Sequence, residues 1–305
     1  MSGRYALMWS GGKDSALALH RARRAGMDVT LLLNFYDAGT GRVRFHATPV
    51  EMLRRQARAI GVELRAVGTS WPEMDGRLRS ELDRLREEGF AGVVFGDIHL
   101  SDVRAWYEER VSAAGLEHVE PLWGDAPADL LAEYVREGGR AVVTCVDLSK
   151  LDGSWLGRIV DEGFAGEIAS TGVDACGEDG EYHSFAFAGP VFARVVEWTA
   201  GERRSDGSFL QLDLRVPDGD QNFRDDVALS LHVDPRPTLE NLARRTGLTY
   251  EEVAHHALVR YASSGAEALL AIEPHALREL IAARKAGDWT KIGAIIDWLE
   301  AGLES

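Results

Sequence analysis

The first part of the chain alternates short apolar runs with longer segments in which apolar residues recur at helical spacing. The apolar runs predict strands at Tyr5–Trp9, Val29–Tyr36, Val62–Val67 and Ala91–Phe95. The helical pattern between them predicts helices at Asp14–Ala25, from Thr48 to about Ile60, at Pro72–Glu88 and from Ser101 to Gly115. Thr48-Pro49-Val50-Glu51 has the form of a capping box, and Ser101 is a second candidate helix cap.

Strands that are separated by helices indicate a parallel sheet with right-handed crossovers. Such sheets bind ligands in the crevice beyond the carboxyl ends of their strands. The topology therefore directs attention to the residues just after Trp9, Tyr36 and Phe95.

The pattern becomes less regular beyond Asp125. It predicts a helix, a strand, a second helix and two further strands, at Ala126–Glu137, Ala141–Val146, Ser154–Glu162, near Val191–Thr199 and at Phe209–Val216. An acidic linker and a helical tail follow. We therefore expect an α/β chain with four parts: a parallel-sheet nucleotide-binding domain at 1–124, a smaller α+β subdomain at 125–217, a linker at 218–236 and a helical domain at 237–305.

Composition and charge exclude several classes. The 305 residues carry a net charge of −15, which disfavours a broad nucleic-acid interface because phosphate binding needs a basic face. No run approaches the ~20 apolar residues of a membrane helix. The 2 cysteines are too few for a disulfide framework, so we expect a cytoplasmic protein.

The segment Ser10-Gly11-Gly12-Lys13-Asp14-Ser15 lies between the first predicted strand and the first helix. Paired glycines allow a close backbone approach to an anion, and the helix that follows offers free N–H groups and a positive dipole. One lysine and two serines add further donors. The spacing differs from a Walker loop and from a dinucleotide fingerprint, so a different phosphate-binding loop is predicted.

This loop matches the PP-loop motif SGGxDS of the N-type ATP pyrophosphatases, which cleave ATP between the α- and β-phosphates. Further segments occur in the order seen in the diphthine–ammonia ligase family, which the chain resembles over residues 4–216: Phe45-His46, Gly96-Asp97-Ile98, Pro121-Leu122-Trp123, Trp155-Leu156-Gly157-Arg158 and Gly177–Ser184. Ser184 stands where that pattern has threonine, and Asp218–Ser305 does not match the short forms of the family.

The resemblance implies an adenine nucleotide alpha hydrolase-like, Rossmann-like fold and the activation of a carboxylate. An acid, diphthine-like or unknown, would be adenylated by ATP with release of pyrophosphate, and ammonia would then displace AMP to give an amide. The ATP-binding residues implied are Ser10, Gly11, Gly12, Lys13, Asp14, Ser15, Asn34, Phe35, His46, Gly96 and Asp97. Mg²⁺ is expected on Asp14 and Asp97, although Asp14 is an equally good helix cap.

The implied catalytic residues are Lys13, Asp14, Glu178, Glu181 and His183. The last three could bind ammonia and take its proton, and the alternative is a solvated acidic turn. For Phe35 and His46 the alternative is a structural role. Cys176 adjoins the acidic segment, but nothing near it in the sequence activates a thiol, so we interpret it as structural.

The tail offers apolar helical stripes that favour packing or a homodimer contact over nucleic-acid binding, since acidic side chains outnumber basic ones by 15 to 9 in residues 218–305. Two other functions remain open. One is a tRNA-modifying PP-loop enzyme, and the other is a non-catalytic protein that senses adenine nucleotides.

Overall fold

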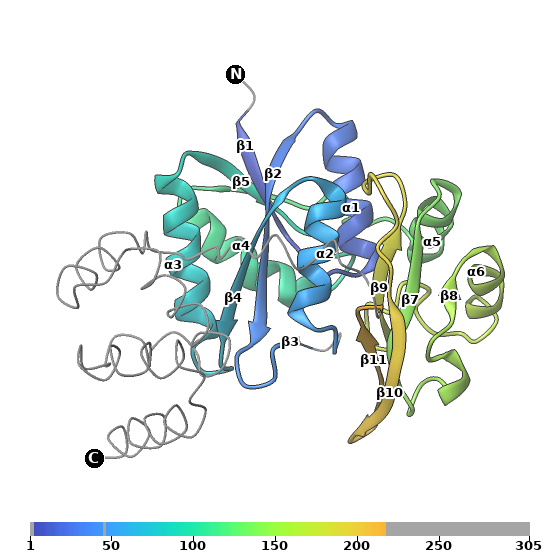
Figure 1. Ribbon diagram of the computed structural model, residues 1–305. Coiled ribbons are helices and arrows are strands. Elements are labelled where there is room, and N and C mark those ends of the chain that lie inside the picture. Colours follow the sequence, from blue (N-terminus) through green and yellow to red (C-terminus); the bar gives the residue numbers. More distant parts are fainter. Residues whose placement is uncertain (1–2, 45–46, 218–305) are drawn as a thin grey trace, which may run out of the picture. The chain divides into compact units, whose positions relative to one another are not determined.

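A computed structural model describes residues 3–44 and 47–217, which belong to one compact unit that spans Met1–Asp226. This part of the chain is a mixed α/β structure with two sheets and six α-helices, as Figure 1 shows. The expected class, α/β with a parallel sheet, is confirmed. His46 and the predicted linker and helical domain (218–236 and 237–305) lie outside the described residues.

The first sheet is parallel apart from one short strand. Its central strand β1 (Arg4–Met8) pairs with β2 (Asp28–Asp37) on one side and β5 (Phe90–Val94) on the other. Strand β4 (Glu63–Thr69) extends the sheet beyond β2, and β6 (Glu117–Val119) extends it beyond β5. Strand β3 (Arg42–Val43) runs antiparallel to the end of β2. The sequence pattern missed β6, because three residues are too few to show a period.

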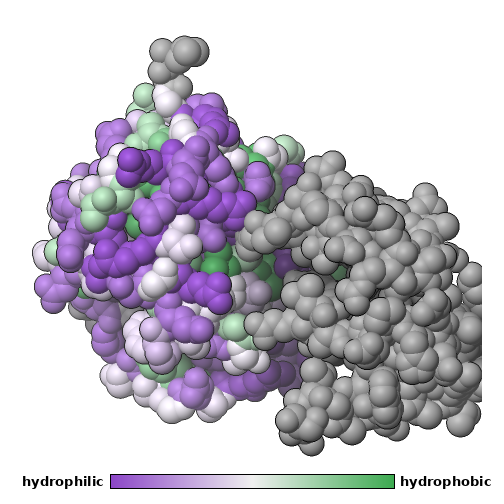
Figure 2. Space-filling view, turned by 90° about the vertical axis from the view of Figure 1, so that its left-hand side faces the viewer, coloured by the Kyte–Doolittle hydropathy of each residue, from purple (hydrophilic) through white to green (hydrophobic). Residues whose placement is uncertain are grey.

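Helices cover both faces of this sheet because neighbouring strand residues point in opposite directions. Leu32 packs with residues of α1 (Lys13–Arg24) and α2 (Val50–Ile60). Leu31 and Leu33 pack in a separate cluster with residues of α3 (Met74–Glu87) and α4 (Ser101–Ala113). The outer surface is mainly hydrophilic on the face shown in Figure 2, with hydrophobic residues in small patches.

Three helix caps that the sequence suggested are wrong. Helix α2 begins at Val50 after Pro49 and has no side-chain cap, because Thr48 lies in an extended segment whose carbonyl accepts a hydrogen bond from Val43. Helix α4 begins at Ser101 itself, so this serine is its first residue and not its cap. Asp14 likewise lies in the first turn of α1 and does not cap it.

The second sheet is built around β7 (Arg140–Asp147), which pairs antiparallel with β8 (Ile159–Val160), β9 (Tyr182–Ala188) and β11 (Phe209–Arg215). Strand β10 (Thr199–Asp206) forms its edge against β11. Helices α5 (Pro127–Arg136) and α6 (Glu162–Ile168) and a short 3-10 helix, Gly153–Trp155, complete this part.

Two predicted elements in this region are wrong. The helix expected at Ser154–Glu162 is replaced by the 3-10 turn and β8, because Trp155 packs edge-on against Phe164 while β8 pairs with β7. The strand expected near Val191–Thr199 is a loop, and its apolar residues Val191 and Val196 are buried without joining a strand ladder.

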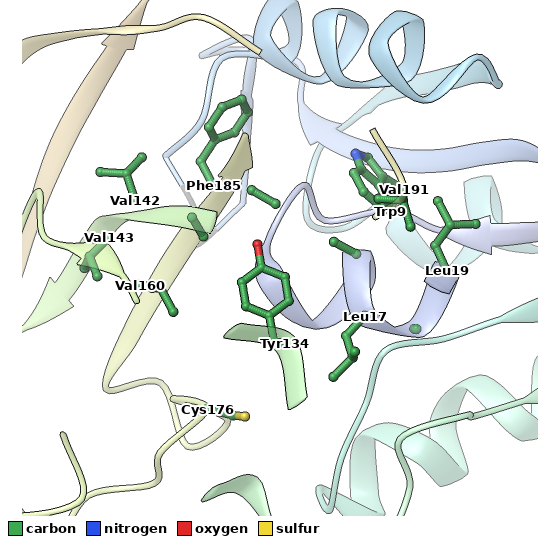
Figure 3. Close-up of a cluster of buried hydrophobic side chains, with 14 of the residues drawn as sticks. Trp9, Leu17, Leu19, Tyr134, Val142, Val143, Val160, Cys176, Phe185 and Val191 are labelled. Atoms are coloured by element: carbon green, nitrogen blue, oxygen red, sulfur yellow. The ribbon is translucent and has the colours of Figure 1, made fainter. Parts of the chain in front are cut away.

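The two sheets share one hydrophobic core. Leu17 of α1, Tyr134 of α5, Val142 of β7 and Phe185 of β9 all belong to a single buried cluster, drawn in Figure 3. This continuity fixes α1 and its preceding loop against β9. The division expected at residue 124 stays a prediction. Within the described part of the chain, no helix has both the length and the apolar character needed to cross a bilayer.

Candidate functional site

A pocket of about 830 Å³ opens at the carboxyl ends of β1, β2 and β5, where the topology places a ligand site. The volume falls within the usual range of ~300–1,000 Å³ for small-molecule sites. The pocket brings together ten of the residues expected from the sequence: Ser10, Lys13, Asp14, Ser15, Asn34, Phe35, Gly96, Asp97, Glu178 and His183.

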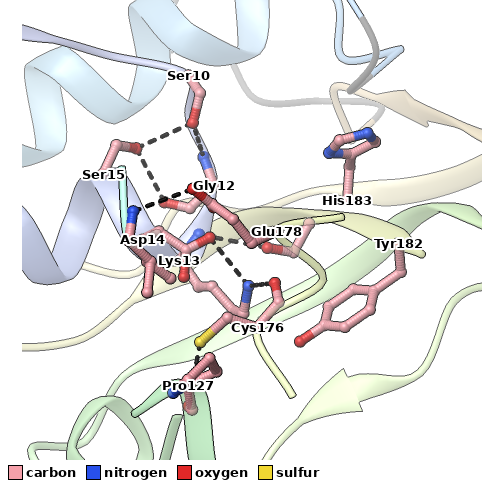
Figure 4. Close-up of polar contacts among 12 residues, drawn as sticks. Ser10, Gly12, Lys13, Asp14, Ser15, Pro127, Cys176, Glu178, Tyr182 and His183 are labelled. Carbon is pink, nitrogen blue, oxygen red and sulfur yellow. Dashed lines mark hydrogen bonds and ion pairs between the residues drawn. The ribbon is translucent and has the colours of Figure 1, made fainter. Parts of the chain in front are cut away.

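The loop between β1 and α1 is held by its own hydrogen bonds, drawn in Figure 4. The Ser15 hydroxyl donates to the Gly12 carbonyl at 3.0 Å, and the Gly12 N–H donates to the Ser10 hydroxyl at 3.2 Å. Gly11 adopts a φ of 84°, a left-handed conformation that favours glycine. Gly11 and Gly12 thus shape the loop, although neither lines the pocket.

Lys13 is 3% exposed and is tied to the second half of the chain. Its ammonium group donates to the Cys176 carbonyl, pairs with Asp14 at 2.9 Å and lies 4.8 Å from the centre of the Tyr182 ring. Burial works to lower the pKa of Lys13, but the charge of Asp14 and other neighbouring groups outweighs it and raises the pKa well above its ordinary value. The pocket therefore keeps a permanent positive charge beside the loop.

Two carboxylic acids on the pocket wall are poised to change charge near neutral pH. Burial, and then the charge of Glu120, raises the pKa of Asp97 to about 6. Burial also raises the pKa of Glu178 to about 7, and the neighbouring Asp14 and Asp97 add to the shift. Glu178 Oε1 accepts a hydrogen bond from the Ile98 N–H at 3.0 Å, which joins the two loops that carry these acids. Such a group can donate or accept a proton at neutral pH.

The structure does not bring Glu181 to this pocket. Its side chain is 4% exposed, and its carboxylate lies 3.7 Å from Lys150 Nζ. His183 does line the pocket, as does Glu178, so the expected group of three is divided.

Cys176 also lines the pocket, but its thiol donates to the Pro127 carbonyl at 3.2 Å. Burial raises the pKa of this thiol well above its ordinary value, which is the opposite of what a reactive cysteine needs. Nucleophilic chemistry at Cys176 is therefore disfavoured.

Asn34 presents a buried acceptor. Its Nδ2 donates to the Trp9 carbonyl at 2.8 Å, while no hydrogen-bond partner is found for Oδ1 among the residues that the structure describes. A buried carbonyl oxygen without a partner costs free energy unless a ligand or water satisfies it. Asn34 lines the pocket, so this oxygen is available to a ligand N–H.

Sequence reasoning missed two groups. The first is a wall of aromatic side chains after β4 and on α4, which includes Trp71 and Trp106. The second is Gln56, which is fully buried on α2 and contacts the loop from behind. A signal for Gln56 was present in the sequence, because it occupies an apolar position of an amphipathic helix, four residues after Met52.

No group of three or more His, Cys, Asp or Glu residues that could hold a metal ion by itself occurs in residues 3–44 and 47–217.

Most of the described chain matches models of known protein families. Residues 3–118 match the family model of the diphthamide synthase N-terminal domain, and residues 126–214 match that of the diphthamide synthase C-terminal domain. Residues 209–303 match a family of unknown function, DUF6027. The chain is 27% identical over 219 residues to the diphthine–ammonia ligase of Homo sapiens, covering 63% of this chain and 82% of that protein. The Bos taurus diphthine–ammonia ligase is 26% identical over 218 residues, with the same coverage.

Proposed function

Because the chain belongs to the diphthamide synthase family, we propose that it is an ATP-dependent ligase that adenylates a carboxylic acid and converts the acid to its amide with ammonia. The observation that carries the proposal is the glycine loop at the start of α1, which joins backbone amides and a buried ammonium group at the sheet edge of a pocket. The fold of the first sheet would then be of the adenine nucleotide alpha hydrolase type.

The proposed reaction has two steps. An oxygen of the acceptor carboxylate attacks the α-phosphorus of ATP, the bond between this phosphorus and the bridging oxygen breaks, and pyrophosphate leaves. The nitrogen of ammonia then attacks the acyl carbon, and AMP leaves as the amide forms. Charge that develops on pyrophosphate would be stabilised by groups that line the pocket, namely the ammonium group of Lys13 and the hydroxyl groups of Ser10 and Ser15, and by the positive end of the α1 dipole.

Glu178 is the proposed base. At neutral pH ammonia is mostly ammonium, which must lose a proton before its nitrogen can attack. Glu178 in its ionised form would bind ammonium and accept that proton, and its raised pKa suits this exchange. Asp97 and His183, which line the same pocket, would assist in binding, whereas the burial of Glu181 against Lys150 favours a structural role for that residue.

Mg²⁺ is proposed as a companion of ATP and not as a resident metal. Mg²⁺ commonly binds through one or two carboxylates and the phosphates of a substrate, and Asp14 and Asp97 supply two carboxylates on the pocket wall. When bound there it would neutralise part of the phosphate charge.

The base of ATP is proposed to lie near Asn34 and Phe35, where the unpartnered Asn34 Oδ1 can accept from an amino group. The acceptor acid would occupy the aromatic wall beside Trp106. This acid is proposed to be diphthine-like, since the relatives are named diphthine–ammonia ligases, or another carboxylic acid, and a panel of acids distinguishes the two. A cytoplasmic location would follow from that function.

The decisive assay is ATP–pyrophosphate exchange with a panel of carboxylic acids, followed by ammonium-dependent release of AMP. Exchange that depends on an acid supports adenylation, and Lys13→Ala should abolish it, whereas Arg86→Ala, at an exposed position of α3, should not. Nucleotide binding without exchange for any acid would favour the sensing function. Exchange stimulated only by tRNA would favour the tRNA-modifying function.

A further inference from the structure

Gln56 lies behind the loop Ser10–Ser15 that joins β1 to α1, and its side-chain amide forms three hydrogen bonds. Its side chain is fully buried. Its Oε1 accepts from the Trp9 indole N–H at 2.8 Å, and its Nε2 donates to the Gly11 carbonyl at 2.8 Å and to the Ala186 carbonyl at 2.6 Å. An indole can only donate and a carbonyl can only accept, so the orientation of the Gln56 amide is determined by its partners.

These bonds join three distant segments. Trp9 and Gly11 flank the start of the loop, Gln56 belongs to α2, and Ala186 belongs to β9 of the second sheet. The Ala186 N–H also donates to the Gly11 carbonyl, at 2.9 Å. The Gly11 carbonyl therefore accepts two hydrogen bonds, both directed away from the pocket.

The position of this carbonyl determines the direction of the next N–H. The structure contains no cis peptide bond among its described residues, and in a trans peptide the C=O and the following N–H point in opposite directions. Holding the Gly11 carbonyl against Gln56 and β9 therefore directs the Gly12 N–H to the other side, where it meets the hydroxyl of Ser10, a pocket residue. Two consecutive glycines would otherwise leave this peptide free to rotate.

We propose that Gln56 is a positioning residue, which holds the Gly11–Gly12 peptide with its carbonyl turned away from the pocket and its N–H on the Ser10 hydroxyl, so that Ser10, and not a carbonyl oxygen, faces the phosphates of the nucleotide. The inference rests on the proposed role of the loop in binding phosphates. It adds that Gln56 and its partner Ala186, which do not line the pocket, influence the affinity for those phosphates. Loss of the Nε2 donors allows the peptide to turn, and a carbonyl oxygen then faces the anion.

The test compares Gln56→Glu and Gln56→Met with the wild type. Glutamate keeps the shape and the acceptor for Trp9 but places a second oxygen opposite two carbonyls. Methionine keeps the volume without donating. Binding of pyrophosphate and of adenosine is measured by calorimetry. Each variant should lose about tenfold or more in pyrophosphate affinity, as expected for a lost buried hydrogen bond. Adenosine affinity should stay within about twofold, because adenosine carries no phosphate for the loop to hold. The loss in Gln56→Glu should deepen as pH rises and the carboxyl ionises.

Met52→Ala is the matched control, since Met52 is buried on the same helix and its truncation destabilises the core without removing a hydrogen bond to the loop. It should lower the melting temperature but keep pyrophosphate affinity. Equal losses of affinity in Met52→Ala and the Gln56 variants would overturn the inference. Unchanged pyrophosphate affinity in the Gln56 variants would also overturn the inference. The absence of a cooperative unfolding transition in both Gln56 variants would overturn it as well, because Gln56 would then be needed for folding. A wild type that binds neither pyrophosphate nor ATP would overturn the proposed function, and the inference with it.

Discussion

The Glu178→Gln variant should be more stable than the wild type at high pH, and it should lose the proposed amide-forming activity. The folded state holds Glu178 at a pKa of about 7, against an ordinary value of 4.5, mainly because of burial. Below pH 4.5 the carboxyl is protonated in both the folded and the unfolded states, and its pKa shift costs nothing. As pH rises towards 7 the unfolded state releases this proton more readily, so the folded state becomes progressively less favoured.

The size of the effect follows from the two pKa values. A rise from 4.5 to about 7 corresponds to about 3 kcal/mol against folding once pH exceeds both values. At pH 5 the same calculation gives less than about 1 kcal/mol. Glutamine removes the titration but keeps the oxygen that accepts the Ile98 N–H. The stability of Glu178→Gln relative to wild type should therefore increase by about 2 kcal/mol between pH 5 and pH 8.

Urea unfolding at the two pH values, followed by circular dichroism, measures this difference. Glu87→Gln is the control, because Glu87 is exposed on α3 and its substitution should change stability equally at both pH values. Ammonium-dependent amide formation by Glu178→Gln should fall by about 10²-fold or more, as expected for loss of a general base. The reasoning is refuted if the stability difference between Glu178→Gln and wild type is the same at pH 5 and pH 8.

Three further predictions concern the fold. Gly92→Ala should lower the free energy of unfolding by about 1–3 kcal/mol, because a Cβ at this position would lie 2.4 Å from a backbone oxygen of β6. Gly76→Ala, in open space on α3, should instead raise the free energy of unfolding by about 0.5–1 kcal/mol. Urea unfolding of both variants measures these changes, and an equal change in the two variants would contradict the prediction. Cys145 and Cys176 are both buried, so Ellman's reagent should label neither until denaturant is added, and rapid labelling of the native protein would show that at least one of the two thiols is accessible. Arg65→Leu should lower the free energy of unfolding by about 3 kcal/mol in the same assay, because Arg65 is 5% exposed and pairs with two glutamates that would lose their partner. A variant as stable as the wild type would mean that water solvates those carboxylates.

Local pattern was sufficient for the four longest strands of the first sheet. The runs around Leu31–Leu33 and Val93–Val94 are apolar on both sides, as buried parallel strands require, and glycines after α1 and α2 ended the helices where expected. It was insufficient where tertiary contacts outweigh local preference. Trp155 stands in a segment with a helical pattern, yet its packing against Phe164 and the pairing of β8 with β7 prevent a helix there.

The sequence by itself determined the alternation of strands and helices in the first half and the glycine loop with its lysine and serines, because each depends on residues that are close together in the chain. Only the tertiary structure decided which distant groups surround that loop. It brought Glu178 to the pocket and left Glu181 against Lys150, and it placed Gln56 and Cys176 beside the loop. The physical reason is that hydrogen bonds between residues far apart in sequence, such as that from Gln56 to Ala186, are formed only when the two sheets close a common core.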